Sequence, residues 1–252
     1  MYILSIETTG KHGSAALIDG DGRISSKSSH EEMNHLKDIM LLADDCLKAE
    51  GIGTNSIEAV AASIGPGSFT GIRIGVSSAR GIAEMLNIPC ISISSLEGMA
   101  ALADAHVGEE VRFFAPIINA RRGQLYGALF ERDGVRYNAV LSERQYMIDE
   151  FLEEIDKIDS EEKQIIFVGD GIDAYEDKIR EAGLYRLADE EWRYQDASSV
   201  APRIATSLSA SPSSIISDSA SALYSPRLSP HVDISPFRRS GLCVRISFNT
   251  AS

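Results

Sequence analysis

Two patterns of hydrophobicity alternate along the first part of the chain. Short apolar, β-prone runs are separated by glycines or by longer segments in which apolar residues recur every three to four positions, as in 31–50. The continuous apolar run at 57–64 is typical of a strand that is buried on both faces. Strands are predicted at 2–8, 14–19, 57–64 and 90–94, and helices at 31–50, 69–87 and 96–105. This alternation predicts an α/β lobe over residues 1–107.

A similar order of elements recurs further along the chain. Turn residues at 120–123 and at Asp133-Gly134 mark the ends of a predicted strand pair. Strands are predicted at 111–118, 124–131 and 165–168, and helices at 144–158 and 174–182. We therefore expect a second α/β lobe over residues 108–196, with the architecture of the first although no repeat is visible in the residues themselves.

The last 56 residues, 197–252, differ from the rest in composition. Sixteen are serine, five are proline, and neither lysine nor glutamate occurs. This segment carries five arginines and two aspartates, whereas residues 1–196 have a net charge of -16. Such a composition is typical of a poorly ordered tail, and a basic arm that binds a partner is the alternative. A helix over 197–208 could still pack on the body of the protein.

Charge and cysteine content restrict the class of protein. The net charge of -13 disfavours strong binding to nucleic acid, so we expect any RNA to be held by a partner and to be contacted only indirectly. Three widely spaced cysteines form neither a disulfide framework nor a metal-ligand cluster, and Cys46 fits a helix as a small filler. Because no apolar run has membrane-spanning length, we expect a soluble, cytoplasmic protein that makes no membrane contact.

The segment Gly65–Gly71 joins a predicted buried strand to a helix. Three glycines there allow backbone N–H groups to converge at the helix N-terminus, which is an arrangement that binds anions. The alternative is that the glycines only permit the turn and close packing of the helix. No lysine follows Gly71, so the segment is not a P-loop.

Three segments together resemble the TsaB (YeaZ-like) family. They are SIGPGSFTGIRIG at 63–75, ILSIETT at 3–9, and PIINARRGQLY at 116–126. The resemblance implies an α/β, two-lobed actin-like fold of the ASKHA, ribonuclease H-like class, and it covers roughly residues 1–200. It also implies a non-catalytic role in the threonylcarbamoylation of adenosine 37 in tRNAs that read codons beginning with A.

The resemblance further implies binding partners and an interface. In that family the first-lobe helices bind the transferase TsaD, the ATPase TsaE takes part, and homodimers form through the same surface. Carried over to this chain, the predicted interface comprises Leu36, Ile39, Met40, Gly71, Arg73, Gly75, Ser78 and Ala79. Small residues on helix 69–87 would form a narrow docking face, so we expect Gly75→Arg to abolish TsaD binding without disturbing the fold.

An actin-like ATPase or a sugar-kinase-type enzyme is the alternative function. In such enzymes the first hairpin offers an aspartate to the metal-nucleotide, whereas here the residue is Glu7. A vestigial nucleotide site would comprise Glu7, Thr8, Thr9, Gly65 and Gly67. We expect no catalytic residues, no metal and no cofactor required by this chain, with ATP acting at the level of the complex.

Histidine and arginine pairs are the remaining candidates for chemistry. His30 and His35 are five residues apart, so on a helix their side chains diverge and cannot easily share one metal ion. A metal-dependent peptidase is therefore disfavoured. Arg121 and Arg122 lie in a predicted turn, where they are either solvated charges or, by the resemblance, residues that stabilise the second lobe or contact a partner.

Overall fold

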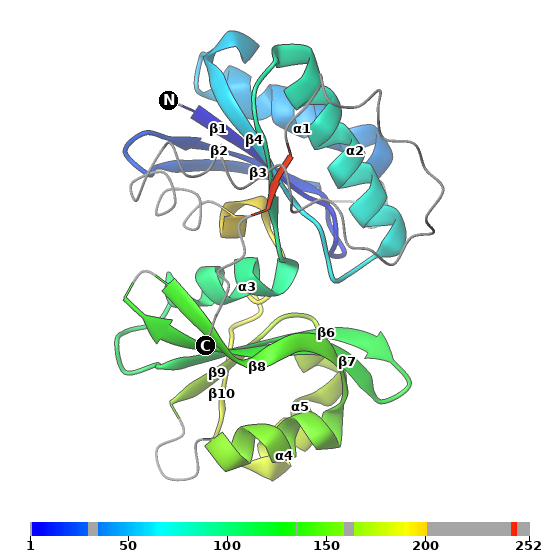
Figure 1. Cartoon of the computed structure of the whole chain (residues 1–252), viewed down its shortest axis with the longest axis vertical. Coiled ribbons are helices and arrows are strands. Elements are labelled where there is room, and N and C mark those ends of the chain that lie inside the picture. The colour runs from blue at the N-terminus through cyan, green and yellow to red at the C-terminus, as the bar shows by residue number, and fades with distance from the viewer. Residues whose placement is uncertain (1, 30–34, 135, 159–163, 201–242, 246–252) are drawn as a thin grey trace. The chain divides into compact units, whose positions relative to one another are not determined.

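The computed structural model describes the chain except for residues 1, 30–34, 135, 159–163, 201–242 and 246–252 (Figure 1). It divides into two units. Unit 1 comprises 1–64, 68–93 and 196–247, and unit 2 comprises 65–67, 94–195 and 248–252. Among the helices in the described ranges, none is long and apolar enough to cross a membrane.

Unit 1 is built on a six-stranded mixed sheet with the order β11-β5-β4-β1-β2-β3. Neighbours β1, β2 and β3 are antiparallel, whereas β4 pairs parallel with β1 and β5 pairs parallel with β4. The edge strand β11 also runs parallel to β5. The strands are β1 (Tyr2–Glu7), β2 (Ser14–Asp19), β3 (Ile24–Ser28), β4 (Ile57–Ser63), β5 (Cys90–Ile93) and β11 (Cys243–Arg245).

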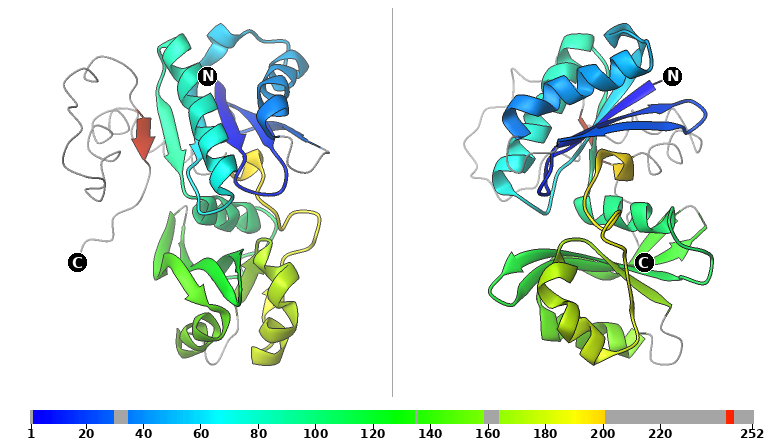
Figure 2. Two further views of the ribbon diagram at one scale, coloured as in Figure 1. Left: turned by 90° about the vertical axis from the view of Figure 1, so that its right-hand side faces the viewer. Right: turned by 180° about the vertical axis from the view of Figure 1, so that it is seen from behind.

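Two long helices, α1 (His35–Ala49) and α2 (Phe69–Leu86), lie side by side on one face of this sheet (Figures 1 and 2). Alternate residues of the strands point toward them, as the pleat requires. Leu4 and Ile6 of β1 pack with Ile39 of α1 and Ile82 of α2 in one buried core. A short 3-10 helix, η1 (Thr54–Ser56), precedes β4.

The 3-10 helix η2 (Ala197–Val200) also packs against the strands of unit 1. The Ser5 hydroxyl donates to the Ala197 carbonyl at 2.7 Å, and the Ala197 N–H donates to Ser14 Oγ at 2.9 Å. Asp196 Oδ2 accepts from the Ser28 hydroxyl at 2.9 Å. The first two bonds satisfy the buried hydroxyls of Ser5 and Ser14, and all three join the start of the segment 197–252 to unit 1.

Unit 2 has a five-stranded sheet with the order β10-β9-β6-β7-β8. Helix α3 lies on one face and helices α4 and α5 lie on the other (Figures 1 and 2). The four largest fully buried side chains, Phe114, Phe130, Phe151 and Phe167, belong to its core. Its elements are α3 (Ser95–Asp104), β6 (Phe113–Arg121), β7 (Gln124–Asp133), β8 (Arg136–Met147), α4 (Ile148–Ile158), β9 (Ile165–Val168), α5 (Gly171–Ala182) and β10 (Arg186–Leu187).

The two sheets share one topology. In unit 2, β6 pairs antiparallel with β7, β7 antiparallel with β8, β9 parallel with β6, and β10 parallel with β9. Strands β6 to β10 therefore repeat the pairing of β1 to β5, and helices α4 and α5 occupy the places of α1 and α2 in chain order. The duplicated architecture that the sequence predicts is present.

Several predicted boundaries need correction. Residues 144–147, predicted as helix, belong to β8, because their backbone continues the pairing with β7 and the helix begins only at Ile148. The unit boundary lies at Ile93/Ser94 rather than at 107/108, since α3 packs on the sheet of unit 2. Asp196 onward returns to unit 1, and of the helix predicted at 197–208 only η2 lies in the described residues.

Helix α2 lies unusually close to the end of β1. A Cβ atom built at Gly71 would overlap the carbonyl oxygen of Thr8, and one built at Gly75 would overlap Thr8 Oγ1. The Thr8 hydroxyl donates to the Gly71 carbonyl at 2.7 Å, so it bonds to the helix backbone directly. The glycines are therefore required by the packing of α2 on β1.

This packing predicts opposite effects for two glycine-to-alanine changes in the same helix. Gly71→Ala should destabilise unit 1 by about 1–3 kcal/mol, because the added methyl group forces the backbone of β1 and α2 apart. At Gly81 an added Cβ meets no atom within 4 Å, so Gly81→Ala should stabilise by about 0.5–1 kcal/mol through helix propensity. Chemical denaturation of both variants measures the difference, and equal stabilities would contradict the close approach.

Candidate functional site

The carboxylate of Glu7 is enclosed at the end of β1, with 1% of the residue exposed. Its Oε1 accepts from the Thr9 backbone N–H at 2.5 Å, and its Oε2 accepts from the Ser63 hydroxyl. Thr8 and Thr9 are buried as well. Of the residues that the sequence groups as a vestigial nucleotide site, Glu7, Thr8 and Thr9 are thus buried in unit 1, whereas Gly65 and Gly67 belong to unit 2.

Burial sets the protonation of this carboxyl group. It raises the pKa of Glu7 above its ordinary value of 4.5, and the negative charge of Asp196 acts in the same direction. Hydrogen bonds from Ser63 and Thr9 stabilise the ionised form and offset part of this rise in pKa. Glu7 therefore favours its neutral form more than an exposed glutamate does, which makes it a poor ligand for a metal-nucleotide.

Hydrogen bonds to neighbouring segments of the chain hold the glycine-rich loop between β4 and α2. Ser68 caps α2, because its Oγ accepts from the Gly71 N–H at 3.2 Å, while the Ser68 N–H donates to the Thr9 carbonyl at 2.8 Å. The Gly65 carbonyl accepts from the Ser95 N–H at 2.9 Å. Gly65 and Gly67 have φ values of 101° and 152°, which residues with a side chain rarely adopt. These bonds favour a structural role for the glycines over an anion cradle.

The predicted interface residues separate into two groups. Met40 and Arg73 are exposed and Ser78 is half-buried, whereas Ile39, Gly71, Gly75 and Ala79 are buried within unit 1. Leu36 lies in α1 at a position outside the described side chains. This placement corrects the small-residue docking face: it lies against β1, so Gly75→Arg would disturb folding and cannot test docking alone.

Exposed apolar side chains are concentrated on the same two helices. Met40 and Leu41 of α1 are 50% and 62% exposed, and Phe69 and Met85 of α2 are 67% and 71% exposed. The Arg73 guanidinium lies 3.9 Å from the centroid of the Phe69 ring. We call these five residues the α1–α2 surface. Its four apolar members are half of the eight large apolar side chains that are exposed in the described part of the chain.

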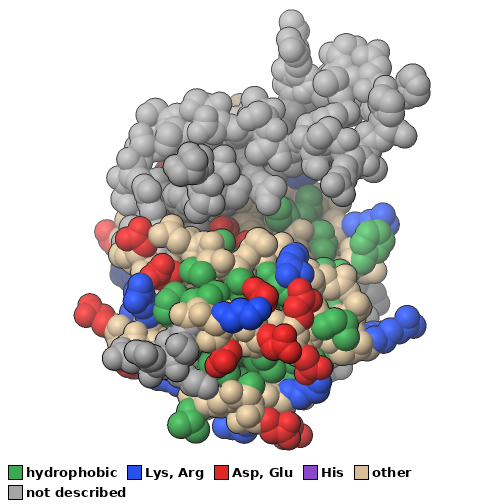
Figure 3. Space-filling model, turned by 60° about the horizontal axis from the view of Figure 1, so that its bottom comes forward, with side chains coloured by type: hydrophobic (Ala, Val, Ile, Leu, Met, Phe, Trp, Pro, Cys, Tyr) green, Lys and Arg blue, Asp and Glu red, His purple; other side chains and the backbone are tan. Residues whose placement is uncertain are grey.

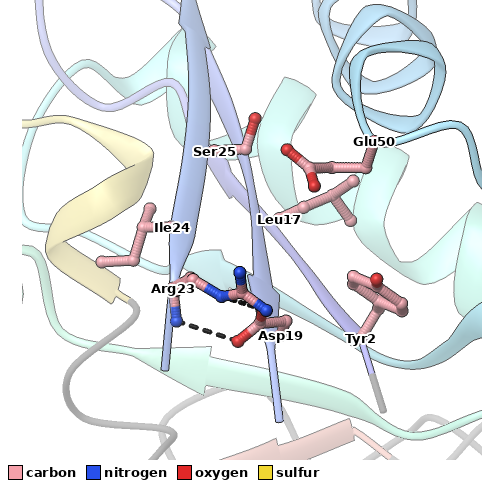
Figure 4. Close-up of a pocket in the computed structure, with 7 residues that line it drawn as sticks. All are labelled: Tyr2, Leu17, Asp19, Arg23, Ile24, Ser25 and Glu50. Atoms are coloured by element: carbon pink, nitrogen blue, oxygen red, sulfur yellow. Dashed lines mark hydrogen bonds and ion pairs between the residues drawn. The ribbon is translucent and has the colours of Figure 1, made fainter. Parts of the chain in front are cut away.

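A polar pocket of about 280 Å³ in unit 1 is lined by residues of β1, β2 and β3, by Arg23 of the turn between β2 and β3, and by Glu50 (Figure 4). Figure 4 shows the Asp19 carboxylate turned toward Arg23. Asp19 Oδ1 accepts the N–H groups of Asp21 and Arg23, each at 2.9 Å, and the Arg23 backbone bond is the main reason that the pKa of Asp19 is lowered. Because the turn itself uses this carboxylate, Asp19 is not free to bind a ligand, and the other carboxylate that lines the pocket is that of Glu50.

The other candidate groups are the histidines and Cys46. Within the described residues, no group of three or more His, Cys, Asp and Glu side chains could hold a metal ion. His30 lies outside those residues, and the side chain of His35 is not described. Burial raises the pKa of the Cys46 thiol to about 11, and its Sγ lies 3.3 Å from the Ala15 carbonyl, as befits a helix filler.

Comparison with known proteins identifies the relatives of the chain. A family model described as tRNA N6-adenosine threonylcarbamoyltransferase (TsaD) matches residues 26–229. The tRNA threonylcarbamoyladenosine biosynthesis protein TsaB of Bacillus subtilis is 30% identical over 169 residues, 67% of this chain and 71% of that protein. Its Escherichia coli counterpart is 33% identical over 190 residues, 73% of this chain and 78% of that protein. The chain belongs to the TsaB family.

A solved structure agrees with this membership. YeaZ from Pseudomonas aeruginosa superposes with a TM-score of 0.66 at 21% identity, covering 84% of this chain and 93% of that one. The α/β, actin-like fold class predicted from the sequence is confirmed. The family-model match reaches residue 229, so the similarity extends further than the limit near residue 200 that the sequence motifs suggest.

The sequence analysis missed three members of the α1–α2 surface in this TsaB-family chain: Leu41, Phe69 and Met85. Phe69 belongs to the glycine-rich motif, and Leu41 and Met85 are in no predicted site. A helical projection could have found Leu41 and Met85, because each lies two residues, about 200° around its helix, from a buried alanine, Ala43 or Ala83.

The buried Glu7 predicts a pH-dependent effect of Glu7→Gln. Because the folded-state pKa is raised, the protonated carboxyl contributes stability that is complete below about pH 4.5 and is lost as pH rises through the folded-state pKa. Glutamine is neutral throughout and can still accept from Thr9 and donate to Ser63. The variant should therefore unfold at a higher temperature than the parent at pH 7, and this advantage should shrink toward pH 4.5.

Thermal unfolding across this pH range is the measurement. The exposed Glu84 of α2, changed to glutamine, serves as the control for loss of a surface carboxylate. A lower unfolding temperature for Glu7→Gln at pH 7 would show that the ionised carboxylate stabilises the fold, contrary to this account.

Proposed function

We propose that this chain is a non-catalytic subunit in the synthesis of threonylcarbamoyladenosine on tRNA. It binds a TsaD-type transferase through the α1–α2 surface, and a TsaE-type ATPase acts with the pair. The observation that carries the proposal is the concentration of exposed apolar side chains on α1 and α2 in a chain whose relatives are named for this pathway.

The composition of the α1–α2 surface supports a role in protein binding. Methionine, aromatic residues and arginine are enriched in the centres of protein interfaces, and this surface contains all three. Both helices are anchored by buried residues on their other faces, so the surface is rigid before a partner arrives. When the transferase is absent, the same surface can pair with a second copy of the chain, which accounts for the predicted homodimer.

A non-catalytic role fits the chemistry at the end of β1. Glu7 is buried and tends toward its neutral form, so we propose that this chain needs no nucleotide or metal of its own and that ATP is used by another component. The net charge of -13 makes it a poor general binder of RNA, which fits a transferase that holds most of the tRNA. A cytoplasmic location stays a prediction.

The surface is tested by placing charge on it. Met40→Glu combined with Met85→Glu should weaken capture of the TsaD-type transferase at least tenfold, about 1.4 kcal/mol or more, because two carboxylates would be buried without partners. Leu184→Glu is the matched control, since Leu184 is 90% exposed but lies in unit 2. Titration calorimetry measures the affinities, and circular dichroism checks the fold. Equal binding by the variant and the control would exclude this surface.

Reconstitution tests the role itself. The transferase and ATPase should modify tRNA only when this chain is added, and the chain alone should hydrolyse no ATP. ATP hydrolysis by the purified chain, lost on Glu7→Ala, would instead support the actin-like ATPase alternative.

A further inference from the structure

The turn between β6 and β7 holds two arginines in an unfavourable backbone conformation. Arg121, Arg122 and Gly123 have φ values of 66°, 53° and 76°, all in the left-handed region. Glycine adopts this region freely, and asparagine does so more readily than other side chains. For an arginine the conformation costs about 1–2 kcal/mol, and here it occurs twice in succession. Folding alone would favour other residues at these positions.

Neighbouring residues of unit 2 hold this turn in place. Asn119 Oδ1 accepts from the Arg121 N–H at 2.8 Å, and the Asn119 N–H donates to Asp170 Oδ1 at 3.0 Å. The hydroxyl of Tyr175, in α5, donates to the Gln124 carbonyl at 2.9 Å. Bonds from both strands thus fix the turn to the start of α5. The arginines project from a support that is ordered before any ligand binds.

The charges of these two arginines have no ionic partner among the described residues. Both side chains are exposed, and neither makes an ion pair with any residue in the described ranges. Elsewhere in unit 2, acidic and basic side chains are interspersed over the face shown in Figure 3. The ion pairs of unit 2 include Arg144–Glu150, Lys157–Glu154, Lys178–Asp149, Arg180–Glu176 and Arg193–Asp173.

We propose that Arg121 and Arg122 form a phosphate-binding turn that contacts the backbone of the tRNA substrate. The proposal rests on the proposed function, which supplies an RNA substrate. A guanidinium presents paired N–H donors that match two oxygens of one phosphate, and it stays charged at every physiological pH. The strained backbone and the surrounding hydrogen bonds are the features expected of a binding element that is maintained at some expense of stability.

The acidic character of the rest of the chain limits what this turn does. A net charge of -13 repels a phosphate backbone, so two arginines by themselves bind a tRNA only weakly. They act as a local contact that fixes the position of RNA bound mainly by the transferase, as backbone contacts do in other nucleic-acid complexes. This contact departs from the purely indirect role for RNA that the overall charge suggests.

The variant Arg121→Asn/Arg122→Asn tests the turn. Asparagine removes both charges but tolerates the left-handed conformation, so the unfolding temperature should be unchanged or higher. Labelled tRNA is titrated by fluorescence anisotropy over a series of salt concentrations, once with the isolated full chain and once with its complex with the transferase. In both series the variant should bind more weakly, and the slope of log K against log salt concentration should fall by about two.

Two controls separate this proposal from the proposed function. Arg180→Gln removes an exposed arginine that is paired with Glu176, and it should leave RNA binding unchanged. Capture of the transferase by the double variant should equal that of the parent. Unchanged RNA affinity in the double variant, or no RNA binding by the parent in either series, overturns the phosphate-binding turn while leaving the proposed function intact.

Loss of transferase capture in the double variant would assign the arginines to a protein interface and would also overturn the proposal. If the parent chain fails to capture the transferase, the proposed function fails instead. The titration with the isolated chain then still decides whether Arg121 and Arg122 bind RNA.

Discussion

The close approach of α2 to the end of β1 determines most of unit 1. Thr8 bonds to the helix backbone at Gly71, and neither Gly71 nor Gly75 has room for a side chain. Because that side of α2 is fixed against the sheet, Phe69, Arg73 and Met85 are directed away from it. The glycines thus act on the exposed surface indirectly: they set the depth and rotation of the helix that carries it.

The duplicated topology places a strand-to-turn junction at the same point in each unit. At the end of β1, the junction turns a carboxylate inward, where Ser63 and Thr9 hydrogen-bond to Glu7. At the end of β6, the corresponding turn directs two arginines outward. One architecture therefore supports two different chemistries, since the pairing of the strands fixes where the turn lies and the residues of the turn decide what it presents.

The sequence predicted the elements that have strong local signals. Its predictions failed where the structure of a segment depends on contacts with residues distant in the chain. The hairpin β1–β2 and helix α2 were predicted because the spacing of their apolar residues and the glycines at their ends mark them in the sequence. The end of β8 was mistaken for helix at 144–147, since its pairing with β7 is a long-range effect that no local pattern shows. The exposure of Phe69 and the burial of Gly75 could not be separated without knowing which side of α2 meets the sheet.

The burial of Glu7 bears on how such a chain contributes to catalysis. A carboxyl group that is removed from solvent and biased toward its neutral form cannot attract a divalent cation as an exposed carboxylate does, since the cation would have to displace the bonds from Ser63 and Thr9. The carboxyl group instead joins β1 to β4 through its bond with Ser63. The groups on which the proposals rest lie instead on the outer surface: apolar side chains on α1 and α2, and the two arginines on the turn after β6, which make no ion pair within the described residues.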